Sequence, residues 1–248
     1  VYKRQVSMSE SDAGSALTDL STKAEVKNNE LILNGQKRWC SGAGHADAYV
    51  VYSRMSNDAG AKGIGAVFLE KDTEGFSFGK NETHMGFRGV PSADMFFDNV
   101  KLPLENIIVP AGGFKKLMEA FDLERCGNTT MSLACAQSAY DFTVAYLRGD
   151  IKGQPIADRR LFATKRFAVA KMYARLAPVR ALWWQVFMEA KGFPSHAEVL
   201  RMYAAQYNVM EVAQEIAALA IRTCGGQSML KLSLIHISEP TRLLSISY

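Results

Sequence analysis

The spacing of apolar residues changes once along this 248-residue chain, between Pro103 and Gly113. Before that point, short apolar runs and alternating stretches are separated by Gly and Asn-Asp clusters, which is typical of β-strands joined by turns. After it, apolar residues recur every three or four positions over long stretches, which indicates amphipathic helices. The sequence therefore predicts an α+β protein with a β part followed by a helical part.

The first part, residues 1–107, is expected to be a β-barrel or β-sandwich. Thr22–Val26 alternates weakly, Asn28-Asn29 is a good tight-turn pair, and Leu31–Leu33 reads as the return strand. Further short strands are expected at residues 48–52, 65–69, 75–79 and 94–100.

The second part, residues 113–231, is expected to be an antiparallel helical bundle. Helical periods run over residues 114–147, 169–187 and 203–221, with Gly or Pro clusters after each. Pro178 falls inside the second period and is expected to kink that helix. Three long helices in water usually need a fourth helix or a partner chain.

Composition excludes several classes of protein. The formal net charge is +4, but Lys and Arg are scattered, so no basic stripe suggests a nucleic-acid partner. The four cysteines form no C-x-x-C pair, so no metal site is expected. No run approaches the roughly 18 apolar residues that a membrane span needs.

Both ends of the chain are expected to differ from those of a natural protein. The chain begins Val1-Tyr2, without an initiator Met or a signal-peptide pattern, so we expect it to start inside its gene. The string LSLIHISEPTR at Leu232–Arg242 resembles the translation of a transposase adapter used in sequencing libraries. We therefore expect residues 232–248 to be a non-native tail.

Four segments resemble the acyl-CoA dehydrogenase family, in the family's order and spacing. Met8–Ser15 (MSESDAGS) is similar to the family's T-E-P-x-A-G-S pattern, and Leu33–Gly42 (LNGQKRWCSG) to its I-N-G-x-K-x-W-I-T-N pattern. Met85–Arg88 (MGFR) with Met95–Pro103 (MFFDNVKLP) is the third segment, and Phe121–Arg125 (FDLER) is the fourth. The resemblance covers about residues 1–231.

The resemblance implies a domain plan and an activity. Residues 1–107 would be the middle β domain and residues 113–231 a truncated C-terminal helical domain, with the N-terminal helical domain missing. FAD and an acyl-CoA would lie between the β domain and the helices, and electrons from α,β-dehydrogenation would pass to an electron-transfer flavoprotein. The family also implies a role in fatty acid metabolism and a homotetramer or homodimer. The location would be cytoplasmic in a bacterium or the mitochondrial matrix in a eukaryote, and the fragment itself would be inactive.

The loop at Met8–Ser15 is the first implied binding segment. By the resemblance, Met8 and Ser9 lie along the flavin pyrimidine edge, and Ser15 approaches the cofactor and the CoA thioester arm. Ser9 retains the hydroxyl of the family's Thr, and Ser11 replaces its Pro. Without the resemblance, an ordinary polar turn is the simpler interpretation.

The segment Trp39-Cys40-Ser41 is the second. By the resemblance, Trp39 covers one face of the isoalloxazine ring, Cys40 follows it at the cofactor, and Ser41 offers a hydroxyl to flavin N5. Taken alone, Trp39 would more simply be a core residue.

Glu124 is the catalytic candidate. The reaction needs a carboxylate to remove the proton alpha to the thioester, and an apolar site raises the pKa of such a group toward neutrality. The resemblance implies that Glu124 is the Glu of an x-E-R motif that supplies this base in some branches, with Asp122 and Arg125 lining the acyl-CoA arm. Other branches have their base in a C-terminal segment that this chain lacks. A solvated residue or a structural ion pair is the simpler interpretation of Glu124 in isolation.

Two motifs depart from the family. Arg148-Gly-Asp-Ile-Lys-Gly153 is one residue longer than R-x-x-F-G and lacks the Phe, while Gly225-Gly226 is followed by Gln-Ser where the family has the rest of G-G-x-G. The resemblance implies that Arg148, Gly225 and Gly226 contact a neighbouring subunit's FAD, and the departures indicate a divergent subfamily.

Two other functions stay open at this point. An acyl-CoA oxidase of the same fold would pass electrons to dioxygen. A DNA-associated alkylation-response relative would act mainly by binding, with steeply salt-dependent affinity.

Overall fold

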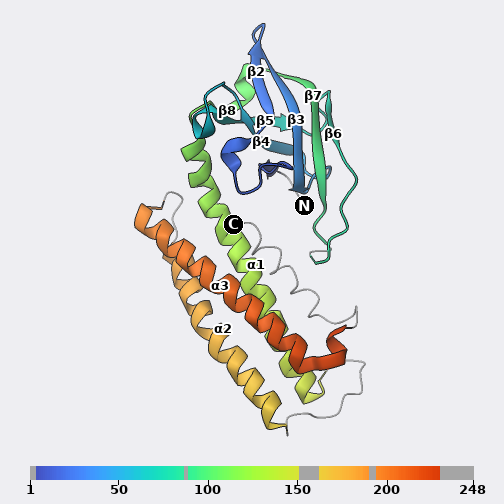
Figure 1. Ribbon diagram of the computed structural model, residues 1–248, viewed down its shortest axis with the longest axis vertical. Helices are drawn as coiled ribbons and strands as arrows, with labels where there is room; N and C mark the ends of the chain where they lie inside the picture. Colours follow the sequence, from blue (N-terminus) through green and yellow to red (C-terminus); the bar gives the residue numbers. More distant parts are fainter. Residues whose placement is uncertain (1–3, 87–88, 151–161, 190–193, 230–248) are drawn as a thin grey trace. The chain divides into compact units, whose positions relative to one another are not determined.

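The computed structural model describes residues 4–86, 89–150, 162–189 and 194–229 (Figure 1). Contacts divide the chain into two compact units, residues 1–84 with 88–120 and residues 121–248 with 85–87. The first unit is built on a β-sheet and the second on helices, which confirms the expected order of secondary structure. The boundaries at residues 107 and 113 stay predictions, and the expected non-native tail lies outside the described residues.

The strands of the first unit form one eight-stranded sheet with the order β6-β7-β3-β2-β4-β5-β8, and β1 pairs with β4 in addition. β1 and β4 run parallel, and the long β3–β7 pair is antiparallel. The strands are β1 Arg4–Ser7, β2 Lys23–Lys27, β3 Glu30–Ser41, β4 Ala48–Arg54, β5 Ile64–Glu70, β6 Phe76–Phe78, β7 Ser92–Leu102 and β8 Ile107–Val109.

The β2–β3 hairpin turns at the residues that the sequence indicated. Asn28 and Asn29 have φ of 52° and 63°, and Lys27 pairs with Glu30 on either side of them. Asn tolerates this left-handed region better than most residues, so it suits a two-residue hairpin turn. The prediction of a tight turn here is confirmed.

The central strands β4 and β5 are buried on both faces. Tyr49 and Val51 face one apolar core, while Tyr52 of the same strand belongs to a second core that includes Leu20 and Leu117. The two cores lie on opposite faces because successive side chains of a strand point in opposite directions. Continuous apolar runs rather than alternation are therefore expected here, and the sequence has them.

The helical unit contains most of three long helices, α1 Phe114–Arg148, α2 Ala163–Glu189 and α3 His196–Cys224. The unit boundary falls inside α1, between Ala120 and Phe121. A capping box starts α3, because the Ser195 side chain accepts from the Glu198 main chain and the Glu198 carboxylate accepts from Ser195. Pro178 lies within α2, which continues on both sides of it.

The three helices share one apolar core. Ala139 and Phe142 from α1, Met172 and Leu176 from α2, and Ile216 from α3 are buried in it. The helices alternate in direction along the chain, so α1 and α3 end on the same side of the bundle (Figure 1). The carboxyl end of each of these two helices carries a predicted cofactor residue.

Candidate functional site

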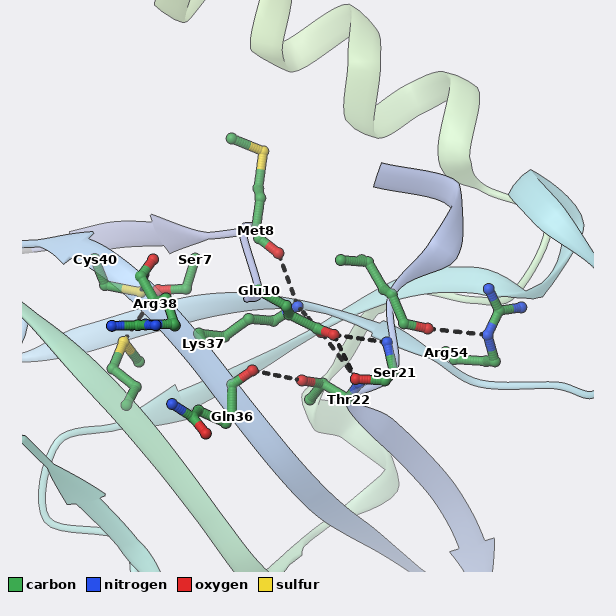
Figure 2. A network of polar contacts seen from close by, with 12 residues as sticks. Ser7, Met8, Glu10, Ser21, Thr22, Gln36, Lys37, Arg38, Cys40 and Arg54 are labelled. Carbon is green, nitrogen blue, oxygen red and sulfur yellow. Dashed lines mark hydrogen bonds and ion pairs between the residues drawn. The ribbon is translucent and has the colours of Figure 1, made fainter. Parts of the chain in front are cut away.

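The loop at residues 8–15 is held by a buried carboxylate. Glu10 is 5% exposed, and its oxygens accept from the main-chain N–H of Ser21 at 2.7 Å, the Ser21 hydroxyl at 2.6 Å and the main-chain N–H of Thr22 at 3.1 Å. Lys37 of β3 completes the set, with Nζ 2.7 Å from Glu10 Oε1 and 2.9 Å from the Met8 carbonyl oxygen (Figure 2).

These neighbours make Glu10 a stronger acid than an ordinary Glu. Burial by itself favours the neutral carboxyl group, but the Lys37 ammonium and the donors of Ser21 and Thr22 outweigh it. Together they lower the pKa of Glu10 to about 2. The carboxylate is therefore ionised at neutral pH, and its bonds to Ser21, Thr22 and Lys37 hold the loop in place.

A β-bulge follows Lys37 on β3. Lys37 pairs with Met95 and Cys40 pairs with Ala93, so Arg38 and Trp39 together face the single residue Asp94. A bulge of this kind redirects side chains, and here it leaves both Lys37 and Cys40 buried although they are three residues apart. Trp39 takes a φ of 54°, which is unusual for a bulky residue.

The bulge exposes Trp39 and surrounds it with charge. Its side chain is 52% exposed, and the Arg38 guanidinium lies 4.9 Å from the ring centroid. Arg38 also pairs with Asp94 at 3.2 Å, and Asp94 accepts from the Trp39 main chain at 3.4 Å. Trp39 is therefore not a core residue in this structure but a fixed aromatic surface.

The other predicted residues of the first unit differ in exposure. Met8 and Ser9 are half-buried and lie against β3, where the Ser9 carbonyl accepts from Arg38 N at 2.9 Å. Ser15 and Ser41 are exposed, so both hydroxyls are accessible. Cys40 faces the core, and burial raises the pKa of its thiol to about 11.

In the helical unit, the predicted substrate residues gather near the start of α1. The Arg125 guanidinium lies over the rings of Phe121 and Tyr203, 4.7 Å and 4.9 Å from their centroids. The Tyr203 hydroxyl donates to Asp122, so α3 is tied to the motif on α1. Sequence reasoning placed Tyr203 only on the apolar face of a helix and missed this link, because the two residues are 81 positions apart.

Glu124 lies beside this cluster on the exposed side of α1. Although the residue is exposed, partial desolvation by the surrounding protein raises its pKa, and the neighbouring Arg125 guanidinium opposes that shift. A carboxylate with a raised pKa suits the role of a general base.

Arg148, Gly225 and Gly226 lie at the shared end of α1 and α3. Arg148 is the exposed last residue of α1. Gly225 caps α3 with a φ of 62°, which a residue with a Cβ would adopt only with strain, and its N–H donates to the Ile221 carbonyl. Both glycines are exposed, and the last three residues of the Arg148 motif, 151–153, lie outside the described residues.

Two sequence signals could have pointed to the Glu10–Lys37 pair. Leu31 and Leu33 face the core, and the same alternation along the strand places Lys37 on the core-facing side. A lysine at a core-facing position needs an acidic partner, and Glu10 lies in the other N-terminal segment that resembles the family.

The described ranges contain no metal-binding cluster and no membrane-spanning helix. No three His, Cys, Asp or Glu side chains there lie close enough to hold a metal ion. No helix in those ranges is long and apolar enough to cross a membrane. An exposed groove on α1 and α2, lined by Tyr140, Tyr173, Trp184 and their neighbours, contains none of the predicted site residues.

Comparison with known proteins identifies the family of the chain. Residues 6–100 match the acyl-CoA dehydrogenase middle domain, and residues 111–244 match the acyl-CoA dehydrogenase C-terminal domain. The chain therefore belongs to the acyl-CoA dehydrogenase family, a class of oxidoreductases.

The individual relatives support membership of this family, but they do not agree on one activity. The chain is 33% identical over 229 residues to acryloyl-CoA reductase (NADH) of Anaerotignum propionicum, covering 90% of this chain and 57% of the relative. It is 32% identical over 221 residues to cyclohex-1-ene-1-carbonyl-CoA dehydrogenase of Geobacter metallireducens, with 88% and 57% covered. The structure of butyryl-CoA dehydrogenase from Megasphaera elsdenii superposes with a TM-score of 0.87 at 25% identity, over 99% of this chain and 63% of that one. The chain thus spans somewhat more than half the length of these relatives.

Proposed function

We propose that the complete gene product containing this chain oxidises an acyl-CoA thioester to its α,β-unsaturated form with FAD as cofactor. Electrons then pass to an electron-transfer flavoprotein. The observation that carries the proposal is Glu124, a carboxylate with a raised pKa at the x-E-R position of a chain that belongs to this family.

The residues of the first unit fit a flavin. Trp39 offers a large exposed ring at a β-bulge, which suits stacking on an isoalloxazine, and the exposed Ser15 and Ser41 offer hydroxyls that suit its polar edge. Met8 and Ser9 are half-buried beside the same strand, where they would line the pyrimidine edge. When bound there, FAD would supply the two-electron acceptor for the hydride that leaves the beta carbon.

Glu124 would hold the proton. In its ionised form the carboxylate removes one proton from the carbon alpha to the thioester carbonyl, as the beta C–H bond loses hydride and the C=C bond forms. Its pKa, raised by desolvation, makes it a better base than an ordinary Glu.

The cluster around Arg125 would position the thioester. Arg125 is held between Phe121 and Tyr203, and Asp122 is held by the Tyr203 hydroxyl. Side chains fixed in this way lose little conformational freedom when a ligand binds.

Assembly is a second part of the proposal. Arg148, Gly225 and Gly226 are exposed at one end of the bundle, where they would meet the FAD of a neighbouring subunit in a homotetramer or homodimer. Light scattering of the complete gene product, with and without Arg148→Ala, tests this; a monomer that binds FAD fully would contradict it.

The activity is tested by anaerobic titration of the complete gene product. Its visible spectrum reports flavin, and additions of acyl-CoAs of different length report reduction. We expect bleaching by at least one acyl-CoA and none in Glu124→Gln. Glu119→Gln is the matched control, because Glu119 lies on the same helix and its pair with Lys115 is long, at 3.9 Å, and exposed.

Other outcomes separate the alternatives. Bleaching that persists in Glu124→Gln would assign the base to another residue, and absence of flavin would contradict the proposal. Peroxide release in air would favour an oxidase. Because the two curated relatives are named as a reductase and a dehydrogenase, the enoyl-CoA product is also supplied to the reduced enzyme.

A further inference from the structure

Two buried charges in the first unit have no part in the proposed chemistry. Lys37 is 0% exposed and Glu10 is 5% exposed. Removing two charges from water is expensive, and an apolar pair of similar volume is often as stable or more stable. Stability alone is therefore a weak explanation for this pair.

The pair joins three segments that are separate in the sequence. Glu10 accepts from Ser21 and Thr22, which precede β2, and from Lys37 on β3. Lys37 also donates to the Met8 carbonyl at 2.9 Å. Figure 2 shows these bonds meeting around the Glu10 carboxylate and the Lys37 ammonium group. The main chain at Met8 is thus tied directly to the ammonium group.

The same lysine stands immediately before the Trp39 bulge. Arg38 N donates to the Ser9 carbonyl at 2.9 Å, so loop and bulge touch through their main chains. On the other side of the strand Arg38 pairs with Asp94. The strand that leads into Trp39 is therefore held by the buried contacts of Lys37 and by the ion pair of Arg38 with Asp94.

We propose that Glu10 and Lys37 are a positioning pair for the flavin site. They fix the main chain of Met8 and Ser9 relative to the Trp39 bulge, so that the flavin-contacting surface is formed before the flavin binds. Neither side chain touches the reacting atoms in this proposal. The inference rests on the proposed function, because it assigns how the flavin surface is held.

The first test replaces Glu10 by Gln in the complete gene product. Gln keeps the volume and an acceptor but leaves the Lys37 ammonium without its counter-charge. We expect the dissociation constant of FAD from the apoprotein to rise at least about tenfold, the effect of losing one hydrogen bond to a charged group. Glu215→Gln is the control, because it removes a carboxylate that pairs with Lys171 and Arg175 on the helices, and FAD affinity should stay within about twofold.

The decisive variant is Glu10→Gln/Lys37→Met, which leaves no unpaired buried charge. Stability should recover toward that of the natural sequence, since removing both partners costs much less than removing one. FAD affinity should not recover, because the tie between Lys37 and Met8 is also gone. Recovery of both together would show a purely structural pair and overturn the proposal. This variant also carries the test if Glu10→Gln alone does not fold.

A readout without flavin separates this inference from the proposed function. Hydrogen exchange of residues 8–15 in the apoprotein should be faster in the double variant than in the natural sequence. Unchanged exchange would overturn the positioning role even if FAD binds. Faster exchange in a protein that binds no FAD would support the tie and contradict the proposed function instead.

Discussion

The indole nitrogen of Trp183 donates a hydrogen bond of 3.0 Å to the Thr130 hydroxyl and so joins α2 to α1 at the edge of the helical core. Trp183 is 4% exposed, whereas the adjacent Trp184 is 65% exposed, because successive residues of a helix point about 100° apart. We expect Trp183→Phe to lower the free energy of unfolding by about 1–3 kcal/mol through the lost hydrogen bond and packing. Trp184→Phe should change it by less than about 0.5 kcal/mol. Urea unfolding followed by circular dichroism compares the two variants, and equal effects would contradict the burial of Trp183 in the helical core.

Two glycines should respond to alanine with opposite signs. Gly35 has a φ of 139°, and a Cβ there would lie 2.7 Å from Thr22 Cα, so Gly35→Ala should cost about 1–3 kcal/mol. Gly127 lies within α1 with no neighbouring atom within 4 Å of an added Cβ, so Gly127→Ala should stabilise by about 0.5–1 kcal/mol. Thermal unfolding of both variants measures this, and a loss of stability in Gly127→Ala would show that another part of the protein covers this face of α1.

Acid should weaken the first unit through Glu10. Its pKa falls from 4.5 to about 2 on folding, so the unfolded chain takes up this proton first as the pH drops. The stabilisation by the ionised carboxylate is fully present above pH 4.5 and is lost as the pH falls toward 2. Free energies of unfolding measured between pH 6 and about pH 3 should fall less steeply in Glu10→Gln/Lys37→Met. Parallel curves for the variant and the natural sequence would refute the shifted pKa.

Glu124 should show the reverse dependence. Its pKa is raised on folding, so the unfolded state ionises first as the pH rises from 4.5, and the residue costs stability above that point. Glu124→Gln should therefore keep or slightly raise the melting temperature at pH 7 while it removes turnover. Calorimetry beside the anaerobic titration tests both. A large loss of stability would mean that Glu124 is a structural residue.

The sequence predicted much of the fold because the relevant signals are local. The two-residue turn at Asn28-Asn29 and the helical period that starts at Phe114 are confirmed. The short strands β1 and β8 were missed, since three or four residues carry little periodicity, although the equally short β6 lies within the strand expected at residues 75–79. β3 extends to Ser41, well beyond the expected return strand at Leu31–Leu33, because its pairing with β7 continues through two bulges.

The candidate site, too, could be predicted from the sequence only where contiguous motifs mark it. The motifs at Met8–Ser15, Leu33–Gly42 and Phe121–Arg125 pointed to the family without any structure, and their roles as binding and catalytic residues stay predictions. The exposure of Trp39 could not be predicted, because it depends on the bulge opposite Asp94.

By itself, the sequence determined the period of each element, the position of one hairpin turn, the order of β and helical parts and the family. Each of these depends on residues a few positions apart or on contiguous motifs. Only the tertiary structure decided that Lys37 meets Glu10, 27 positions away, and that Tyr203 meets Asp122, 81 positions away. Such partners are selected by strand order and helix packing, and a buried charge or hydroxyl is stable there only because the whole fold brings its counterpart to it.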